Sequence, residues 1–186
     1  KSAAIVHEDA DLDAFENDVR WGIFFNAGQV CSAMSRVIVN ESRHDELVER
    51  ISALARSLSV GPGTEHTEFG PNMGAMVSEA QRDRAVGMVR AAVSEGAQLA
   101  TRGHKIDQPG AFMEPALLCI VTPDMAIAKD EVFGPVLSVL KFHSDAEALE
   151  IANGTPFGLA SGVFTRDLDR ATHTARHLRA GQVYVN

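Results

Sequence analysis

Short apolar runs that are typical of β-strands alternate along this chain with segments of helical periodicity. That alternation is expected of a parallel sheet whose connecting helices cover it. Strands are predicted at residues 3–7, 35–41, 98–101, 116–121, 136–142, 160–165 and 182–185, and helices at 45–58, 78–95, 145–152 and 168–178, with one more helix that begins near the acidic residues 9–13 and runs through Trp21. The sequence therefore predicts an α/β fold, a single domain with a mainly parallel sheet covered by helices.

The composition supports a folded domain and disfavours several kinds of partner. Of the 186 residues, 45% are apolar, which is enough to form a core without disulfides or metals. The formal net charge of −8 disfavours nucleic acid and anionic membranes, because both require clustered Lys and Arg. The apolar stretches are far shorter than the roughly 20 residues that span a bilayer, so no membrane segment is predicted. The two cysteines lie far apart, which indicates a reducing compartment and predicts a cytoplasmic location.

A loop that carries a thiol joins the first predicted helix to the next strand. Within residues 24–36, a turn-permitting Gly28 precedes Cys31, and junctions of this kind expose side chains. The small residues Ser32 and Ala33 leave room beside the sulfur atom. The backbone amide of the cysteine could donate to an oxyanion that forms when the thiol attacks a carbonyl. Cys31 is therefore a candidate nucleophile for acyl chemistry.

The alternative interpretation is that Cys31 is a small buried apolar residue, as most free cysteines are. Cys119 is the clearer example, because it lies in the apolar run 116–121 and is predicted to be inert in a covered strand. None of the seven histidines lies near Cys31 in the sequence, and no metal-ligand cluster is predicted. His173 and His177 are predicted to lie on the polar surface of a helix.

Two further segments have suggestive compositions. In residues 129–136, two carboxylates precede an aromatic side chain, a Gly-Pro break and a strand. Glu131 could accept hydrogen bonds from ribose hydroxyls while Phe133 lines a planar ring, although such an acidic pair is usually just solvated. Residues 155–165 are rich in glycine but lack the Lys-Ser/Thr ending of a phosphate loop, so this segment is interpreted as structural.

Taken together and in this order, these segments resemble the catalytic domain of the NAD(P)-dependent aldehyde dehydrogenase superfamily. Residues 24–31 match the motif F-x-x-x-G-Q-x-C, and residues 131–135 match the E-[IV]-F-G-P box. Residues 156–160, followed by residues 181–186, match the closing strands of that domain. The similarity runs over the whole chain, and three ordered motifs are far more specific than any single one.

The resemblance implies that a cysteine thiolate attacks an aldehyde, that hydride passes to the nicotinamide of NAD or NADP, and that water hydrolyses the resulting thioester. Cys31 takes the place of the nucleophile, and its amide should serve the oxyanion hole. Glu131 should bind the nicotinamide ribose, and Phe133 should flank the nicotinamide end. The product is the corresponding carboxylic acid.

The resemblance also suggests residues around these groups. Phe25, Val30 and Ser32 should line the tunnel through which the aldehyde enters. Gln81 falls where some relatives contact the cofactor, although an exposed helix glutamine with no such role is an equal alternative. The parent enzyme is expected to be a homodimer or a homotetramer.

The chain is expected to be a fragment, since it begins with Lys1 rather than methionine. Only Lys1 and Ser2 remain of the family's E-L-G-G-K-S segment, so the general-base glutamate, the nucleotide-binding domain and the C-terminal tail are expected to lie outside it. We therefore predict that the 186-residue chain alone does not turn over. A cysteine-dependent esterase or thioesterase and a non-catalytic structural relative remain alternatives, and retention of Cys31 and Glu131 disfavours the second.

Overall fold

A computed structural model describes residues 1–64 and 73–186 of the chain. Seven strands form one sheet in the order β3-β4-β5-β2-β1-β6-β7, and every neighbouring pair is parallel except the antiparallel pair of β3 and β4. The strands are β1 (Ala3–Val6), β2 (Arg36–Asn40), β3 (Gln98–Leu99), β4 (Ala116–Cys119), β5 (Val136–Phe142), β6 (Ala160–Phe164) and β7 (Gln182–Val185). The α/β fold with a mainly parallel sheet is confirmed.

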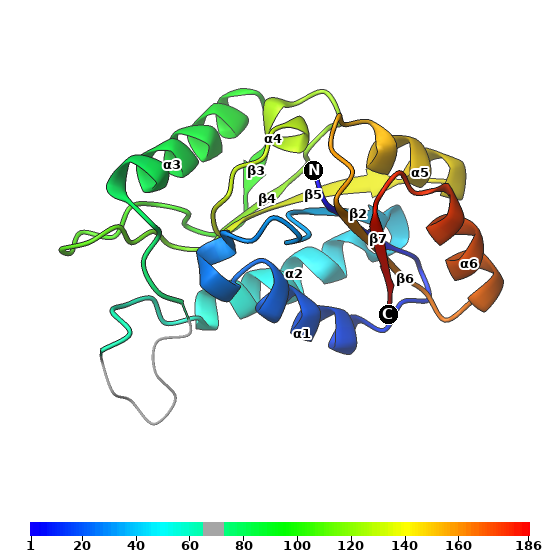
Figure 1. Cartoon of the computed structure of the whole chain (residues 1–186), viewed down its shortest axis with the longest axis horizontal. Helices are drawn as coiled ribbons and strands as arrows, with labels where there is room; N and C mark the ends of the chain where they lie inside the picture. The colour runs from blue at the N-terminus through cyan, green and yellow to red at the C-terminus, as the bar shows by residue number, and fades with distance from the viewer. Residues whose placement is uncertain (65–72) are drawn as a thin grey trace.

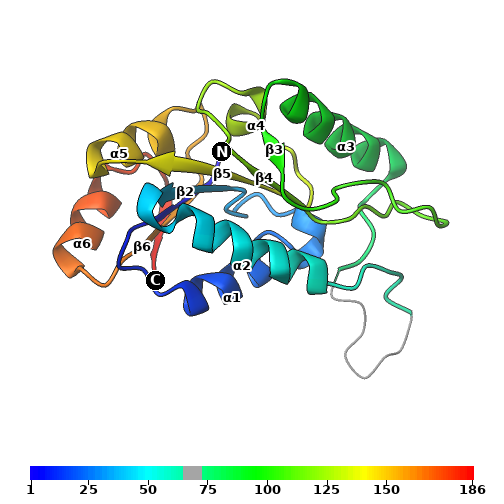
Figure 2. The same ribbon diagram turned by 180° about the vertical axis from the view of Figure 1, so that it is seen from behind.

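Helices cover both faces of the sheet, as Figures 1 and 2 show from opposite sides. The helices are α1 (Leu12–Gly22), α2 (His44–Ser57), α3 (Glu79–Ser94), α4 (Ala126–Lys129), α5 (Asp145–Asn153) and α6 (Leu168–His177), with short 3-10 turns η1 (Phe25–Gly28) and η2 (Glu41–Arg43). Helices α1 and α2 pack on one face, and α3 to α6 pack on the other. The domain is therefore a three-layer α/β structure.

The alternation of side chains along β1 explains why the sheet needs two cores. Ala3 and Ile5 belong to the core beneath α3 to α6, whereas Ala4 and Val6 belong to the core beneath α1 and α2. Successive side chains of a strand point to opposite faces, so a strand covered on both sides must be apolar throughout. All four residues of β1 are buried, so this strand lies in the interior of the fold.

Polar side chains fix the starts of four helices. Asp11 and Asp167 accept hydrogen bonds from the first-turn amides of α1 and α6, and Ser78 and Ser144 do the same for α3 and α5. An oxygen at this position satisfies amides that have no partner within the helix. The helix expected to begin near the acidic residues 9–13 is thus capped by Asp11, and α6 is capped by Asp167.

The structure corrects the sequence prediction at two strands. The predicted strand 98–101 is limited to the two residues of β3, and it runs antiparallel at the edge of the sheet. The predicted strand 116–121 ends at Cys119, because Ile120 adopts a positive φ of 57° and leaves the sheet.

The connections place two of the predicted site segments at the same end of two neighbouring strands. The thiol-bearing loop leads into β2, and residues 131–135 lead into β5. Since β2 and β5 are parallel neighbours, the segments that precede them lie at the same, amino end of the strands. Among the described residues, no helix has both the length and the apolar character needed to cross a membrane.

Candidate functional site

The loop that carries Cys31 is folded tightly against the segment that precedes β5. Asn26, Ala27 and Gly28 have φ values of 52°, 53° and 70°, a left-handed conformation that is uncommon outside glycine. A Cβ atom on Gly28 would lie 2.1 Å from the carbonyl oxygen of Gly134, so only glycine allows the two backbones to approach this closely. The contact joins the two motifs that the sequence analysis singled out, although more than a hundred residues separate them.

Cys31 follows this turn and is an exposed, free thiol. Its backbone carbonyl accepts a hydrogen bond from the Ser2 hydroxyl at 3.4 Å, which ties the loop to the start of β1. The interpretation of Cys31 as a buried apolar residue is therefore wrong. A reagent in solution can reach a thiol placed in this way.

Cys119 has the opposite surroundings, as the sequence predicted. It is buried at the end of β4, and burial raises the pKa of its thiol. Its sulfur lies 3.5 Å from the carbonyl oxygen of Gln98 on the neighbouring strand. A buried thiol with a raised pKa supplies little thiolate, so Cys119 is suited to packing and not to nucleophilic attack.

The Glu131–Phe133 segment presents its two predicted cofactor-binding side chains to solvent. Glu131 is exposed, and Phe133 is 37% exposed with a φ of 55°. Val132 between them is buried in the core under α3. The buried Val132 anchors the segment while the carboxylate and the ring on either side stay accessible.

Side chains from α3 hold this segment in place. The Gln81 side-chain amide donates to the carbonyl oxygens of Val132 and Phe133, both at 2.9 Å. The Arg84 guanidinium donates to the carbonyl oxygens of Val132 at 2.9 Å and Glu131 at 3.1 Å. Gln81, predicted as a cofactor contact, thus donates its side-chain hydrogen bonds to the backbone of the candidate site. Arg84 was missed, because nothing in the sequence around it signals this role.

The residues just before α3 also hold the cysteine loop. The side-chain oxygen of Gln29 accepts a hydrogen bond from the Val77 amide at 2.8 Å, while its nitrogen donates to the Asn26 carbonyl at 3.0 Å. Residues 77–84 therefore bind both loops, one through Gln29 and the other through Gln81 and Arg84. The predicted G-Q-x-C motif contains Gln29, but the motif alone does not reveal its partner.

The predicted tunnel residues lie on both sides of the nucleophile. Phe25 is exposed, and Val30 and Ser32 are half-buried. Ser32 lines a mostly apolar pocket of about 380 Å³ together with Trp21, Met34 and others, whereas Phe25 and Val30 are not among its lining residues. Trp21 is largely exposed at the end of α1 and did not stand out in the sequence as a site residue.

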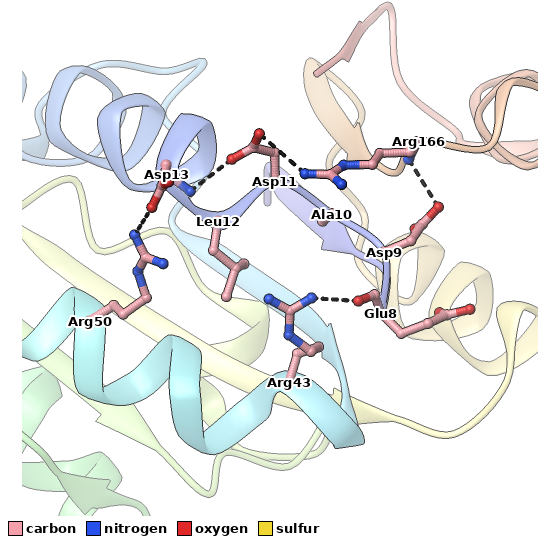
Figure 3. A pocket seen from close by; sticks show the side chains of 9 residues that line it. All are labelled: Glu8, Asp9, Ala10, Asp11, Leu12, Asp13, Arg43, Arg50 and Arg166. Carbon is pink, nitrogen blue, oxygen red and sulfur yellow. Dashed lines mark hydrogen bonds and ion pairs between the residues drawn. The ribbon is translucent and has the colours of Figure 1, made fainter.

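A larger pocket of about 450 Å³ lies away from Cys31, among the residues that follow β1 and β6 (Figure 3). Ion pairs line it: Arg50 with Asp13, and Arg166 with Asp11 at 3.5 Å. Arg43 closes another side by donating to the Glu8 carbonyl. Its charged groups already bind one another, so this pocket offers none of the chemistry expected around the thiol.

Comparisons with known proteins agree on one family. The profile of the aldehyde dehydrogenase family matches residues 1–186. The mitochondrial aldehyde dehydrogenase of Leishmania tarentolae is 42% identical over all of this chain and 37% of its own length. The mouse protein named aldehyde dehydrogenase, cytosolic 1 is 40% identical over all of this chain and 36% of its own length.

Solved structures give the same result. The NAD⁺ complex of aldehyde dehydrogenase from Bacillus cereus matches all of this chain and 37% of its own, with a TM-score of 0.94 and 38% identity. The NAD-dependent aldehyde dehydrogenase of Sinorhizobium meliloti matches all of this chain and 36% of its own, with a TM-score of 0.90 and 38% identity. The chain thus spans little more than a third of the length of these relatives, and it belongs to the aldehyde dehydrogenase family.

Proposed function

We propose that residues 1–186 are the cysteine-bearing catalytic domain of a longer NAD(P)-dependent aldehyde dehydrogenase that oxidises an aldehyde to a carboxylic acid. The observation that carries this proposal is the packing of Gly28 against Gly134, which joins an exposed thiol loop to the segment with Glu131 and Phe133. Family membership supports it, as do one relative that is named NAD-dependent and one whose structure is an NAD⁺ complex.

In the proposed reaction, the Cys31 thiolate attacks the aldehyde carbon to form a thiohemiacetal. The backbone amide of Cys31 is proposed to donate a hydrogen bond to the oxyanion that forms in this step. The thiohemiacetal carbon then loses a hydride and becomes a thioester. Attack by water on the thioester releases the carboxylic acid and returns the thiol. Phe25, Val30 and Ser32 are proposed to line the path of the aldehyde.

The residues of the Glu131–Phe133 segment fit a dinucleotide. The exposed carboxylate of Glu131 only accepts hydrogen bonds when it is ionised, so it suits the two hydroxyls of a ribose. The exposed ring of Phe133 suits a planar nicotinamide. When bound, NAD or NADP would supply the acceptor for the hydride. Glu131 and Phe133 are proposed to orient it, and Gln81 is proposed to contribute by holding their backbone, with a direct cofactor contact as its alternative role.

The remaining predictions concern the longer protein. We propose a homodimer or homotetramer. We also propose a cytoplasmic location, which the free, unpaired state of both cysteines supports. The relatives include one protein named mitochondrial and one named cytosolic, so location differs within the family.

The test is a panel of aldehydes assayed with NAD and with NADP, on a protein that carries this sequence within the full length of its relatives. We expect acid and reduced cofactor in equal amounts. Cys31→Ala should lower kcat by at least about a thousandfold, since the variant lacks the proposed nucleophile. The matched control Cys119→Ala should retain the activity, because that thiol is buried away from the loop.

A second variant tests the cofactor assignment. Glu131→Gln should raise the KM for the cofactor while leaving the rate of Cys31 alkylation unchanged. Release of acid from an ester or thioester without nicotinamide, together with no aldehyde oxidation, would instead identify a cysteine-dependent esterase. An unchanged kcat in Cys31→Ala would contradict the assignment of the nucleophile.

A further inference from the structure

The turn that precedes Cys31 is closed by two side chains, each of which binds the backbone of the other residue. The Asn26 side chain donates to the Gln29 carbonyl at 3.0 Å, and the Gln29 side chain donates to the Asn26 carbonyl, also at 3.0 Å. The Gln29 backbone amide donates to the same Asn26 carbonyl at 3.1 Å. We call this reciprocal pair of side chains the 26–29 clasp.

The clasp surrounds a backbone conformation that other contacts must hold in place. Asn26 and Ala27 have φ values of 52° and 53°, in the left-handed region that few residues other than glycine adopt. In this conformation the Cβ atom of Ala27 crowds the carbonyl oxygen that follows it. Strained residues of this kind persist only where their surroundings fix them, and they are frequent at functional sites. Two kinds of contact fix this turn, namely the clasp and the packing of Gly28 against Gly134.

Gln29 also attaches the clasp to a point outside the loop. Its side-chain oxygen accepts a hydrogen bond from the Val77 amide at 2.8 Å, just before α3, while its side-chain nitrogen donates to Asn26. Both ends of the carboxamide are therefore bound, which fixes its orientation. A carboxylate at this position would keep an acceptor but would have no donor for the Asn26 carbonyl.

These hydrogen bonds fix the peptide groups that lead to the nucleophile. The Gln29 carbonyl, which the Asn26 side chain binds, belongs to the peptide that joins Gln29 to Val30. The Val30 carbonyl accepts a hydrogen bond from the Ala33 amide at 3.0 Å, which closes a turn with Cys31 at its first corner. Within the part of the chain that the structure describes, the Cys31 amide donates to no acceptor, so it is available to a ligand.

We propose that Asn26 and Gln29 are positioning residues that hold the Cys31 amide in the direction in which it donates to an oxyanion. The inference rests on the proposed function, in which the thiolate adds to a carbonyl carbon and the carbonyl oxygen takes up the negative charge. A donor that is already oriented stabilises this charge without reorganising during the reaction. In this role both side chains act through the backbone of the loop and contact neither the thiol nor the substrate.

Two reagents that react with the same thiol separate this role from simple exposure. With p-nitrophenyl acetate, the Cys31 thiolate attacks the ester carbon and the carbonyl oxygen becomes an oxyanion. The bond to the p-nitrophenyl oxygen then breaks, which releases p-nitrophenolate and leaves a thioester. With iodoacetamide, the thiolate displaces iodide from a carbon atom and no oxyanion forms. The ratio of the acylation rate constant to the alkylation rate constant therefore reports on the oxyanion donor, since effects of thiol exposure largely cancel.

The ratio should fall when the clasp is broken. All proteins carry Cys119→Ala, so that Cys31 is their only thiol. Gln29→Ala and Gln29→Glu should each lower the ratio by about two- to tenfold, the usual effect of one lost hydrogen bond on an equilibrium, because the competent loop conformation is then less populated. Asn26→Gly should also lower it, since glycine keeps the left-handed conformation but has no side-chain donor. Gln98→Ala removes an exposed glutamine on β3 and should keep the ratio of the parent.

Thermal unfolding of each variant verifies that the labelled protein is folded. Should Gln29→Ala not fold, Gln29→Glu and Asn26→Gly carry the test, because the first is nearly isosteric and the second suits the turn. An unchanged ratio in the folded clasp variants would overturn the proposal, as would an equal fall in Gln98→Ala. A matching loss of both rate constants would do the same, because the clasp would then govern only the exposure of the thiol.

The outcome can be told apart from that of the aldehyde panel. The two reagents need no cofactor, so the ratio is measured on the 186-residue chain alone. Aldehyde oxidation by the longer protein, together with an unchanged ratio, would refute only the role of the clasp. A lowered ratio without aldehyde oxidation would support the clasp and refute only the dehydrogenase activity.

Discussion

At the scale of single residues, position in the fold separates two chemically identical side chains. Cys31 follows a left-handed turn before the amino end of β2 and is exposed, whereas Cys119 ends a covered strand. The sequence anticipated this contrast from local context, because a Gly-containing junction predicts exposure and an apolar run predicts burial. The contact of Gly28 with Gly134 could not be anticipated, since no local pattern reports a partner so distant in the chain.

The two thiols should react with iodoacetamide at rates that differ by at least about tenfold, Cys31 being faster. Accessibility favours Cys31, and burial raises the pKa of Cys119. Mass spectrometry of peptides from the briefly labelled, folded chain measures both sites at once. Labelling in urea should equalise them, which shows that the fold is responsible. A Cys31→Ala chain that labels as fast as the parent would contradict the assignment.

Two glycines should respond in opposite ways to substitution by alanine. Gly28→Ala should lower the free energy of unfolding by more than about 2 kcal/mol, because the new methyl group meets the Gly134 carbonyl in a left-handed conformation. Gly87 is exposed within α3 and has open space around it, so Gly87→Ala should raise the free energy of unfolding by about 0.5 to 1 kcal/mol. Urea unfolding measures both. Equal effects of the two substitutions would show that the tight approach of the loops is not required.

At the scale of elements, buried polar groups determine how helices join the sheet. His7, directly after β1, is fully buried, and neither ring nitrogen has a hydrogen-bond partner among the described residues. Its ring packs edge-on against Phe142 with centroids 5.5 Å apart, and Nδ1 lies 3.5 Å from a carboxylate oxygen of Asp145 at the start of α5. The sequence predicted both β1 and α5 but could not predict that a histidine would be enclosed between them.

This histidine should make the stability of the domain depend on pH. Burial lowers the pKa of His7, an effect that Asp145, Glu8 and Asp9 oppose and Arg170 reinforces. The unfolded chain therefore binds a proton near pH 6.5 that the folded chain does not, and the contribution of His7 to stability is lost as the pH falls through the folded pKa.

The parent should be compared with the variant His7→Leu, in which the titrating imidazole is replaced by an apolar side chain. Urea unfolding of the parent and the variant between pH 5 and pH 8 isolates the effect as the difference between two slopes, because other groups titrate in both proteins. Below pH 6.5 the parent should lose stability more steeply, by at most about 1.4 kcal/mol per pH unit for one proton. Parallel curves would show that His7 titrates alike in the folded and unfolded states.

At the scale of the whole molecule, the two ends of the sheet differ in chemistry. In open parallel sheets, ligands usually bind beyond the carboxyl ends of the strands. Here the residues that follow β1 and β6 line the pocket of ion pairs, whereas the segments with Cys31 and Glu131 precede β2 and β5 (Figures 1 and 3). Hydrophobic periodicity predicted the strands and most helix bounds. It could not predict the order of the strands or which end carries the site, because both depend on pairing between distant segments.

The proposal that this chain is one part of a longer enzyme has a consequence that can be measured on the chain itself. The exposed Cys31 loop is complete within the chain, so an aldehyde should add to this thiol and slow its alkylation by iodoacetamide. This chain should not form NADH continuously, because it corresponds to only 36% to 37% of the length of the relatives that bind NAD. The comparison is the same assay on a protein with the full length of the relatives, in which the aldehyde should protect Cys31 and NADH should also form.

Continuous NADH formation by the 186-residue chain would show that it contains the whole catalytic apparatus. Failure of aldehyde to protect Cys31 in either protein would show that the thiol does not receive the substrate.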